Sequence, residues 1–172
     1  MKTLKRTLLA ACLLIGTSAF AQEPVTPAVN TDHYRTAIGL RGGPTSGLTI
    51  KHFTSGTRAV EGILGVWNNG FRGTVLFEQH VNAGAPGLHW YYGVGAHASA
   101  YADNRTFYVY DNRYEYREGE LGIGVDGIIG IEYKIPPIPF ALSVDIKPAL
   151  EVTTDGNVFG GFDPGLGVKF TF

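Results

Sequence analysis

The chain has 172 residues, enough for one domain, with 14 Lys and Arg against 15 Asp and Glu. This balance lacks the concentrated positive charge that phosphate binding needs, so nucleic acid is excluded as a partner. No run after residue 21 is long and apolar enough for a membrane helix of about 20 residues. If the mature chain sits in a membrane, it must therefore do so as a closed barrel.

Residues 1–21 predict a secretory signal peptide. Three basic residues precede a short apolar run, and a small-x-small cleavage site ends at Ala21. An alternative is a lipoprotein cleavage box at 9–12, which would make Cys12 a lipidated N-terminus. Only about five apolar residues precede that cysteine, where about 7 to 15 are usual. Cleavage after Ala21 would remove three basic residues, no acidic ones and the single cysteine, leaving a net charge of −4.

Residues 22–32 hold two prolines and little apolar content, which predicts a flexible lead-in. From residue 33 to 172 the pattern is alternation with period two, broken by Gly, Pro, Asn and Asp clusters, and this is typical of β-strands. We expect an all-β fold with eight strands, at 33–41, 47–53, 58–67, 71–81, 88–101, 120–135, 139–152 and 162–172.

The alternation is clearest in 139–152. Val144 and Ile146 share an apolar face, whereas Asp145 and Lys147 share a charged one, because successive side chains on a strand point to opposite sides. Pro148 interrupts the strand, and since proline cannot donate to the ladder we expect a bulge or an early end of pairing there.

The connections favour an up-and-down barrel. Short turns at 54–57, 82–87 and 136–139 alternate with junctions that include the longer segments 102–119 and 153–161. With the N-terminus in the periplasm, the long segments lie outside the cell, as in outer-membrane barrels.

The content of the polar face favours a membrane barrel over a secreted lipocalin-like one. A soluble barrel's outer face should be rich in charge, but this face carries many glycines and nearly balanced charges. Eight strands enclose an interior that side chains fill, so we expect a filled, charge-balanced lumen, with a narrow small-solute or ion channel as the alternative. The expected lumen network comprises Arg35, Arg41, Lys51, Glu61, Arg72, Glu78, Asp126, Glu132, Lys134, Asp145, Lys147, Glu151 and Lys169.

The last strand, Gly-Leu-Gly-Val-Lys-Phe-Thr-Phe, resembles the C-terminal signature of outer-membrane barrels. Segments 47–53, 90–97 and 145–148 resemble a widespread group of barrel proteins with no established activity, and residues 34–172 look like the OmpA/OmpX-type porin-fold families. The resemblance implies an eight-stranded antiparallel transmembrane β-barrel in the outer membrane of a Gram-negative bacterium. It also implies contact with outer-membrane lipid, and recognition of Phe170 and Phe172 by the barrel-assembly machinery.

His97 and Ser99 are the one pair that suggests nucleophilic catalysis, because residues two apart on a strand share a face. The pair faintly resembles the His-x-Ser element of outer-membrane lipid A deacylases, so a lipid A-modifying enzyme is a further alternative. The parity places both side chains inside the barrel, and we expect a barrel-lining histidine and no enzyme. The five histidines are scattered, so we expect no metal and no cofactor.

Residues 104–117 predict a hairpin that continues two strands beyond the membrane surface. A turn at Asp111-Asn112 would pair Tyr110 with Arg113 and Phe107 with Tyr116. An exposed ribbon of this kind suits contact with an extracellular protein or polymer, and a rigid loop with no partner is the alternative. The expected contact residues are Phe107, Tyr108, Tyr110, Tyr114 and Tyr116.

Overall fold

The structure is a computed structural model that describes residues 34–67, 70–102, 105–109, 112–116 and 120–172, with 105–109 and 112–116 described by backbone alone. The predicted signal peptide, Cys12 and the lead-in lie outside the described residues. No helix in the described part of the chain is long and apolar enough to cross a membrane.

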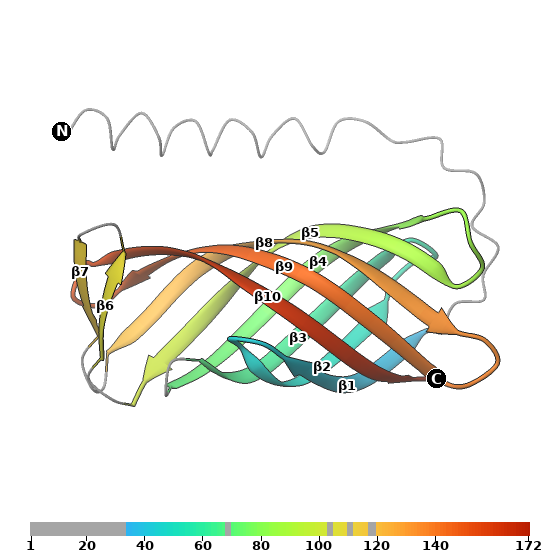
Figure 1. Ribbon diagram of the computed structural model, residues 1–172, viewed down its shortest axis with the longest axis horizontal. Coiled ribbons are helices and arrows are strands. Elements are labelled where there is room, and N and C mark those ends of the chain that lie inside the picture. The colour runs from blue at the N-terminus through green and yellow to red at the C-terminus, as the bar shows by residue number, and fades with distance from the viewer. Residues whose placement is uncertain (1–33, 68–69, 103–104, 110–111, 117–119) are drawn as a thin grey trace.

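Eight strands close into one antiparallel barrel (Figure 1), which confirms the predicted all-β, eight-stranded fold. Each strand pairs with its sequence neighbours in the wall, and the last strand closes on the first. The strands are β1 (Thr36–Gly42), β2 (Ser46–Phe53), β3 (Arg58–Trp67), β4 (Gly70–Asn82), β5 (Leu88–Tyr101), β8 (Leu121–Ile135), β9 (Phe140–Thr153) and β10 (Val158–Thr171).

Two strand boundaries differ from the prediction by several residues. β1 begins at Thr36 and not at 33, and β10 begins at Val158 and not at 162. The expected long connection 153–161 is therefore a short turn, because Val158 already pairs with Val152 of β9. Two glycines and a proline in 160–164 hid the first part of β10 from the alternation pattern.

Pro148 does not shift the register of β9. The β8–β9 ladder is interrupted between the pairs Asp126–Ala149 and Ile129–Ile146, and the same register resumes on the other side. Pairing of Pro148 with β10 continues. The expected bulge is therefore absent from the described β8–β9 and β9–β10 ladders. Proline lacks an N–H, and the ladder accommodates it by losing hydrogen bonds locally without an inserted residue.

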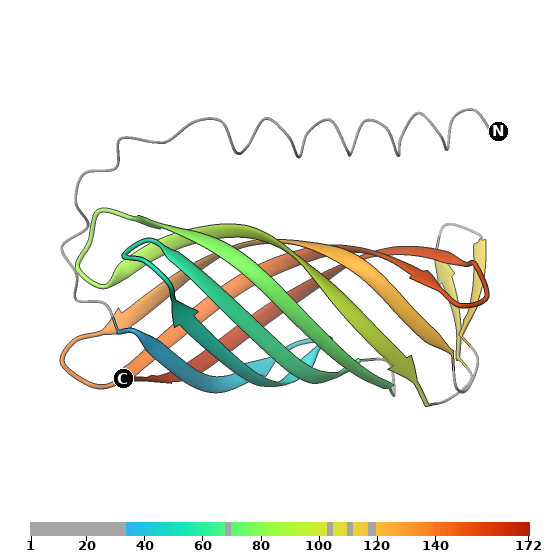
Figure 2. The same ribbon diagram turned by 180° about the vertical axis from the view of Figure 1, so that it is seen from behind.

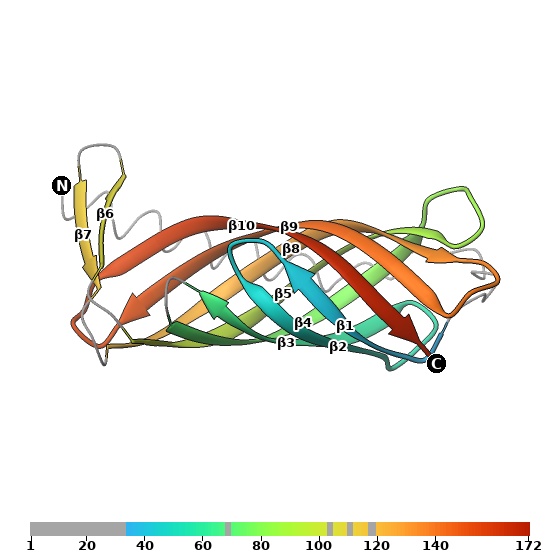
Figure 3. The ribbon, with the colours of Figure 1, turned by 60° about the horizontal axis from the view of Figure 1, so that its bottom comes forward.

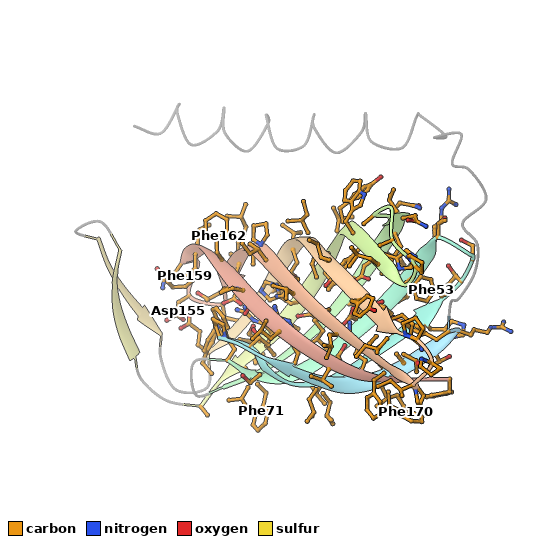
Figure 4. All side chains as sticks on the ribbon, turned by 45° about the vertical axis from the view of Figure 1, so that its right-hand side comes forward. Phe53, Phe71, Asp155, Phe159, Phe162 and Phe170 are labelled. Carbon is orange, nitrogen blue, oxygen red and sulfur yellow. The ribbon has the colours of Figure 1, made fainter. Side chains whose placement is uncertain are left out.

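Side chains alternate between the two faces of the wall as predicted for 139–152. Val144 and Ile146 are 59% and 48% exposed, whereas Asp145 and Lys147 are 6% and 0% exposed. Figure 4 shows Phe71, Phe162 and Phe170 on the outer surface of the barrel. The outward residues thus form an apolar belt around the wall, and the polar residues fill the lumen.

The two ends of the barrel are different. One end, called the inner end, holds the C-terminus and the turns at 54–57, 83–87 and 136–139. The other, called the outer end, carries a two-stranded ribbon of β6 (Arg105–Val109) and β7 (Asn112–Tyr116) (Figure 1 and Figure 2). Aromatic side chains of the belt gather at the inner end: Trp90, Tyr92, Tyr133, Phe140, Phe170 and Phe172.

The ribbon exists, but its predicted register is wrong by two residues. Phe107 pairs with Tyr114 and not with Tyr116, and Val109 pairs with Asn112 and not with Tyr114. A shift of the pairing register by two residues leaves each side chain on the same face of its strand. The aromatic side chains expected on this ribbon, including Tyr110, lie outside the part whose side chains the structure describes, so their role stays a prediction.

Candidate functional site: the ionic network of the lumen

The inner cluster is built around one lysine. The Lys51 ammonium lies 2.8 Å from Glu61, 2.7 Å from Glu78 and 3.2 Å from Glu132. Lys169 reaches the same region from β10, at 3.1 Å from Glu61 and 3.3 Å from Glu132. All five side chains are buried, so every charge here depends on its partners for the hydration that it lost.

Aromatic and hydroxyl groups complete the inner cluster. The Tyr34 hydroxyl donates to Glu132, and a histidine, His80, lies with Nε2 3.0 Å from Glu78. The His80 ring stacks on Tyr91 at 5.0 Å between centroids, and Lys51 lies 4.3 Å over the same tyrosine ring. The Lys51 charge is thus held by carboxylates and by a π-face at once.

The outer cluster starts at Arg41 of β1. This guanidinium lies 2.7 Å from Asp145 and 3.2 Å from Asp163. Lys147 continues the network from Asp163, at 3.3 Å, to Asp126, at 2.9 Å. Asp163 is thus shared between Arg41 and Lys147, so cations and carboxylates alternate from Arg41 to Asp126.

His97 bridges two carboxylates in the outer cluster. Its Nδ1 lies 2.7 Å from Asp126 and its Nε2 lies 2.8 Å from Glu151. Carboxylates accept and do not donate, whereas a neutral imidazole has a single N–H, so only the doubly protonated ring donates to both. The Glu151 carboxylate also accepts hydrogen bonds from the Arg72 guanidinium at 2.7 Å and from the Ser99 hydroxyl at 2.9 Å.

The charge balance differs from the predicted one. Among the described residues, the ion-paired lumen groups hold more carboxylates than Lys and Arg, with one extra carboxylate in each cluster. Each cluster also holds one buried histidine hydrogen-bonded to a carboxylate, His80 or His97. The bases are Arg41, Lys51, Arg72, Lys147 and Lys169, and the acids are Glu61, Glu78, Asp126, Glu132, Asp145, Glu151 and Asp163.

An apolar cluster of Ile63, Leu76, Tyr91 and Ile128 lies between the two ionic clusters. On β4, Leu76 stands between Arg72 and Glu78, and on β8, Ile128 stands between Asp126 and Glu132. The Tyr91 hydroxyl crosses the layer and donates to Asp145 at 3.3 Å. The lumen is therefore filled by charge, an apolar layer and charge again.

Inward glycines make room for these long side chains. A Cβ added to Gly124 would lie 2.4 Å from the His97 ring, and one added to Gly130 would lie 2.6 Å from Tyr91. At Gly165, a Cβ would meet the Arg41 guanidinium at 2.3 Å. At these three positions, glycine leaves room for a large polar side chain that a neighbouring strand sends across the lumen.

Two residues of the predicted network lie outside it. Arg35 is exposed, because it precedes β1, and Tyr34 is the residue that enters the lumen there. The Lys134 ammonium is half-buried near the inner end and donates to the carbonyl of Ile138 at 2.7 Å. The structure places the other eleven in the two clusters and adds Asp163, whose parity on β10 matches Lys169 and could have revealed it.

The structure does not assemble His97 and Ser99 as a base and a nucleophile. Both His97 nitrogens contact carboxylates, and the Ser99 hydroxyl donates to Glu151 while accepting from Arg72 Nε at 2.9 Å. Both side chains are buried in the lumen.

Comparison with known proteins gives one informative match. No family model matches the chain, and no curated protein matches it. Among solved structures, the chain is similar to the N-terminal β-barrel domain of Pseudomonas aeruginosa OprF, with a TM-score of 0.55 and 17% sequence identity. The match covers 80% of this chain and 95% of that one. At this identity the likeness shows the fold: the chain has the eight-stranded barrel architecture of the OprF domain.

Proposed function

We propose that this chain is an outer-membrane barrel with a closed lumen, and that it serves to hold the β6–β7 ribbon at the cell surface as a contact site for an extracellular protein or polymer. The observation that carries the proposal is the combination of a lumen filled by paired charges with a separate two-stranded ribbon at the outer end (Figure 1). In this proposal residues 1–21 direct export, and His97 and Ser99 belong to the lumen network and not to catalysis.

The apolar belt supports the membrane location. A continuous band of exposed aliphatic side chains around the wall, bordered by aromatic residues at one end, matches hydrocarbon and would be poorly soluble in water. Fractionation of expressing cells, followed by heat-modifiable gel mobility, tests this step. Recovery of the folded chain from the soluble periplasm without detergent would contradict it.

The filled lumen supports a closed barrel and argues against a general pore. Planar-bilayer recordings of the refolded barrel should show no steady conductance, because Lys51, Leu76 and Lys147 occupy successive levels of the lumen. A steady cation-selective current would favour the alternative of a narrow ion channel, for which the excess of carboxylates would be the cause.

The ribbon is tested by replacing residues 104–117 with a short Gly-rich turn. The barrel should still assemble, since β5 and β8 pair with each other up to Ala100 and Leu121 without it. Loss of cell adhesion or of a co-purifying surface component is the expected result. Unchanged binding together with changed solute permeability would place the function in the lumen.

Assembly by the barrel-assembly machinery is part of the same proposal. Phe172 lies on the lipid-facing side at the inner end, next to Phe170 at 6.2 Å between ring centroids. Deletion of Phe172 should lower the yield of folded barrel and leave precursor in the periplasm. Deletion of the ribbon is the control, because it leaves this C-terminal strand intact.

A further inference from the structure

The barrel wall has two heights. β1 and β2 have 7 and 8 residues, whereas β9 and β10 have 14 each. At the inner end the short and long strands reach the same level, because Thr36 and Phe172 exchange backbone hydrogen bonds and the Thr171 N–H donates to the Pro139 carbonyl at 2.9 Å. At the outer end the β1–β10 ladder stops at Gly42 and Leu166, while β10 continues to Val158. Figure 3 shows the β1–β2 hairpin ending well short of the outer end that β10 reaches.

The apolar belt follows the same step. On β1 the exposed apolar residues are Ile38 and Leu40, and on β2 they are Leu48 and Ile50. Toward the inner end of the barrel the apolar residues of β1 and β2 are followed by two outward polar ones, Thr36 and His52, whose side chains are hydrogen-bonded at 2.9 Å. On β9 the belt is much taller, with exposed apolar residues Phe140, Leu142, Val144, Ile146, Leu150 and Val152.

These residues give the height of the belt on each side. Ile38 and Leu40 are two positions apart, which is about 5 Å along the axis of a barrel with tilted strands. Phe140 and Val152 are twelve positions apart, which is about 30 Å along the same axis. The apolar band of a membrane barrel is about 25 Å tall, so the β9 side matches a bilayer and the β1–β2 side falls short of it.

The β1–β2 hairpin cannot extend farther toward the outer end, because hydrogen bonds hold its turn against the barrel wall. Thr45 donates its N–H to Asp163 at 3.0 Å, and the Arg41 guanidinium donates to the Thr45 carbonyl at 2.9 Å. Within the turn, the Ser46 hydroxyl donates to the Gly43 carbonyl at 2.6 Å. The exposed turn 42–44 therefore stays at the level where the hydrocarbon of a flat bilayer would surround it.

We propose that the outer leaflet is thinned against the β1–β2 hairpin, so that lipid headgroups descend to this turn and contact it. Lipid adapts to a short hydrophobic stretch by thinning, since polar backbone groups are not left exposed to hydrocarbon. The partner of this surface is thus the polar headgroup region of the bilayer, and the exposed Phe162 of β10 borders the depression. The inference rests on the membrane location proposed above.

Two matched positions test the depth of the bilayer on each side. Leu48 lies five residues from the inner end of β2 and Ile129 lies six from the inner end of β8, and their exposures are 58% and 57%. In a Cys12→Ala background, Leu48→Cys and Ile129→Cys each carry a fluorophore in phosphatidylcholine vesicles. Quenching is measured with nitroxide-labelled lipids, with the nitroxide on the headgroup or deep in the acyl chain.

The label at Leu48 should be quenched more strongly by the headgroup nitroxide, and the label at Ile129 by the deep one. Equal preference for the deep nitroxide at both positions would overturn the inference and leave the membrane location intact. Absence of quenching at both positions would instead contradict the membrane location. In vesicles of a shorter-chain lipid the difference between the two labels should shrink, and an undiminished difference would count against thinning.

Discussion

The inner and outer clusters neutralise buried carboxylates in different ways. In the inner cluster Lys51 alone contacts three glutamates, and Lys169 duplicates two of those contacts. In the outer cluster most carboxylates are shared between two cationic groups, as Asp126 is between His97 and Lys147. The inner arrangement concentrates its stability in one side chain, whereas the outer one distributes it over several.

The two histidines repeat this difference. His97 contacts carboxylates with both ring nitrogens, whereas His80 contacts Glu78 with one, and its Nδ1 has no hydrogen-bond partner among the described residues. The His80 ring is held by its stack on Tyr91 as well. One histidine is thus fixed mainly by charge and the other partly by ring packing.

The largest expected effect is that of Lys51→Met. Removal of this charge leaves Glu78 without its cationic partner in the inner cluster, and breaking a buried ion pair from one side costs about 3–5 kcal/mol. The free energy of unfolding, measured by urea titration with heat-modifiable gel mobility, should fall by that amount. A loss below about 1 kcal/mol would show that the inner cluster does not depend on one lysine.

Lys147→Met should cost less, about 2 kcal/mol, although Lys147 is as deeply buried as Lys51. Asp126 keeps His97 and Asp163 keeps Arg41 after this change, so no carboxylate loses every partner. The same urea titration checks it. A loss equal to that of Lys51→Met would mean that sharing of carboxylates gives the outer cluster no protection.

Gly124→Ala tests how tightly the outer cluster is packed around His97. The added Cβ would lie 2.3 Å from the Leu150 carbonyl oxygen and 2.4 Å from the His97 ring, and overpacking of this kind costs about 1–3 kcal/mol. Gly73→Ala is the control, because its Cβ faces open space on the outside of the wall. Equal stability of the two variants would indicate that both His97 and the backbone at Leu150 can move without loss of stability.

The smallest expected effect is the difference between substitutions of the two histidines. His97→Gln removes one of two hydrogen bonds to carboxylates, with an expected loss of about 2 kcal/mol, and His80→Gln should lose about 1 kcal/mol. The order of the two losses is the measured quantity. A larger loss at His80 would show that its stack on Tyr91 matters more than the second carboxylate of His97.

Alternation with period two predicted the barrel and its inward face, because all inward side chains of a regular strand are separated by an even number of residues. Asp145 and Lys147 follow this rule, and Ile128, an apolar residue at an inward position, packs in the apolar layer of the lumen. Arg35 did not follow it, because the chain enters β1 only at Thr36. The rule holds inside strands and fails just beyond their ends.

Contacts across the lumen could not be predicted in the same way. Lys169 and Glu61 are separated by 108 residues in the chain and meet only because the wall closes. The register of the ribbon was also beyond the pattern, since a shift by two residues leaves the alternation unchanged. The height of the wall at β1 and β2 could not be predicted either, because it depends on the residue at which strand pairing ends, and alternation does not specify that residue.

The seam between β1 and β10 has a consequence for how the chain folds. It joins the first strand to the last, with Ala37 opposite Thr171, so it has the longest sequence separation in the wall. Arg41 and Asp163 meet across this seam, and Lys169 carries its charge from β10 to Glu61 on β3. Long-range pairings form late and slowly. The charges of the lumen therefore remain hydrated until the final strand arrives, and dehydration of the interior and closure of the wall become a single cooperative event.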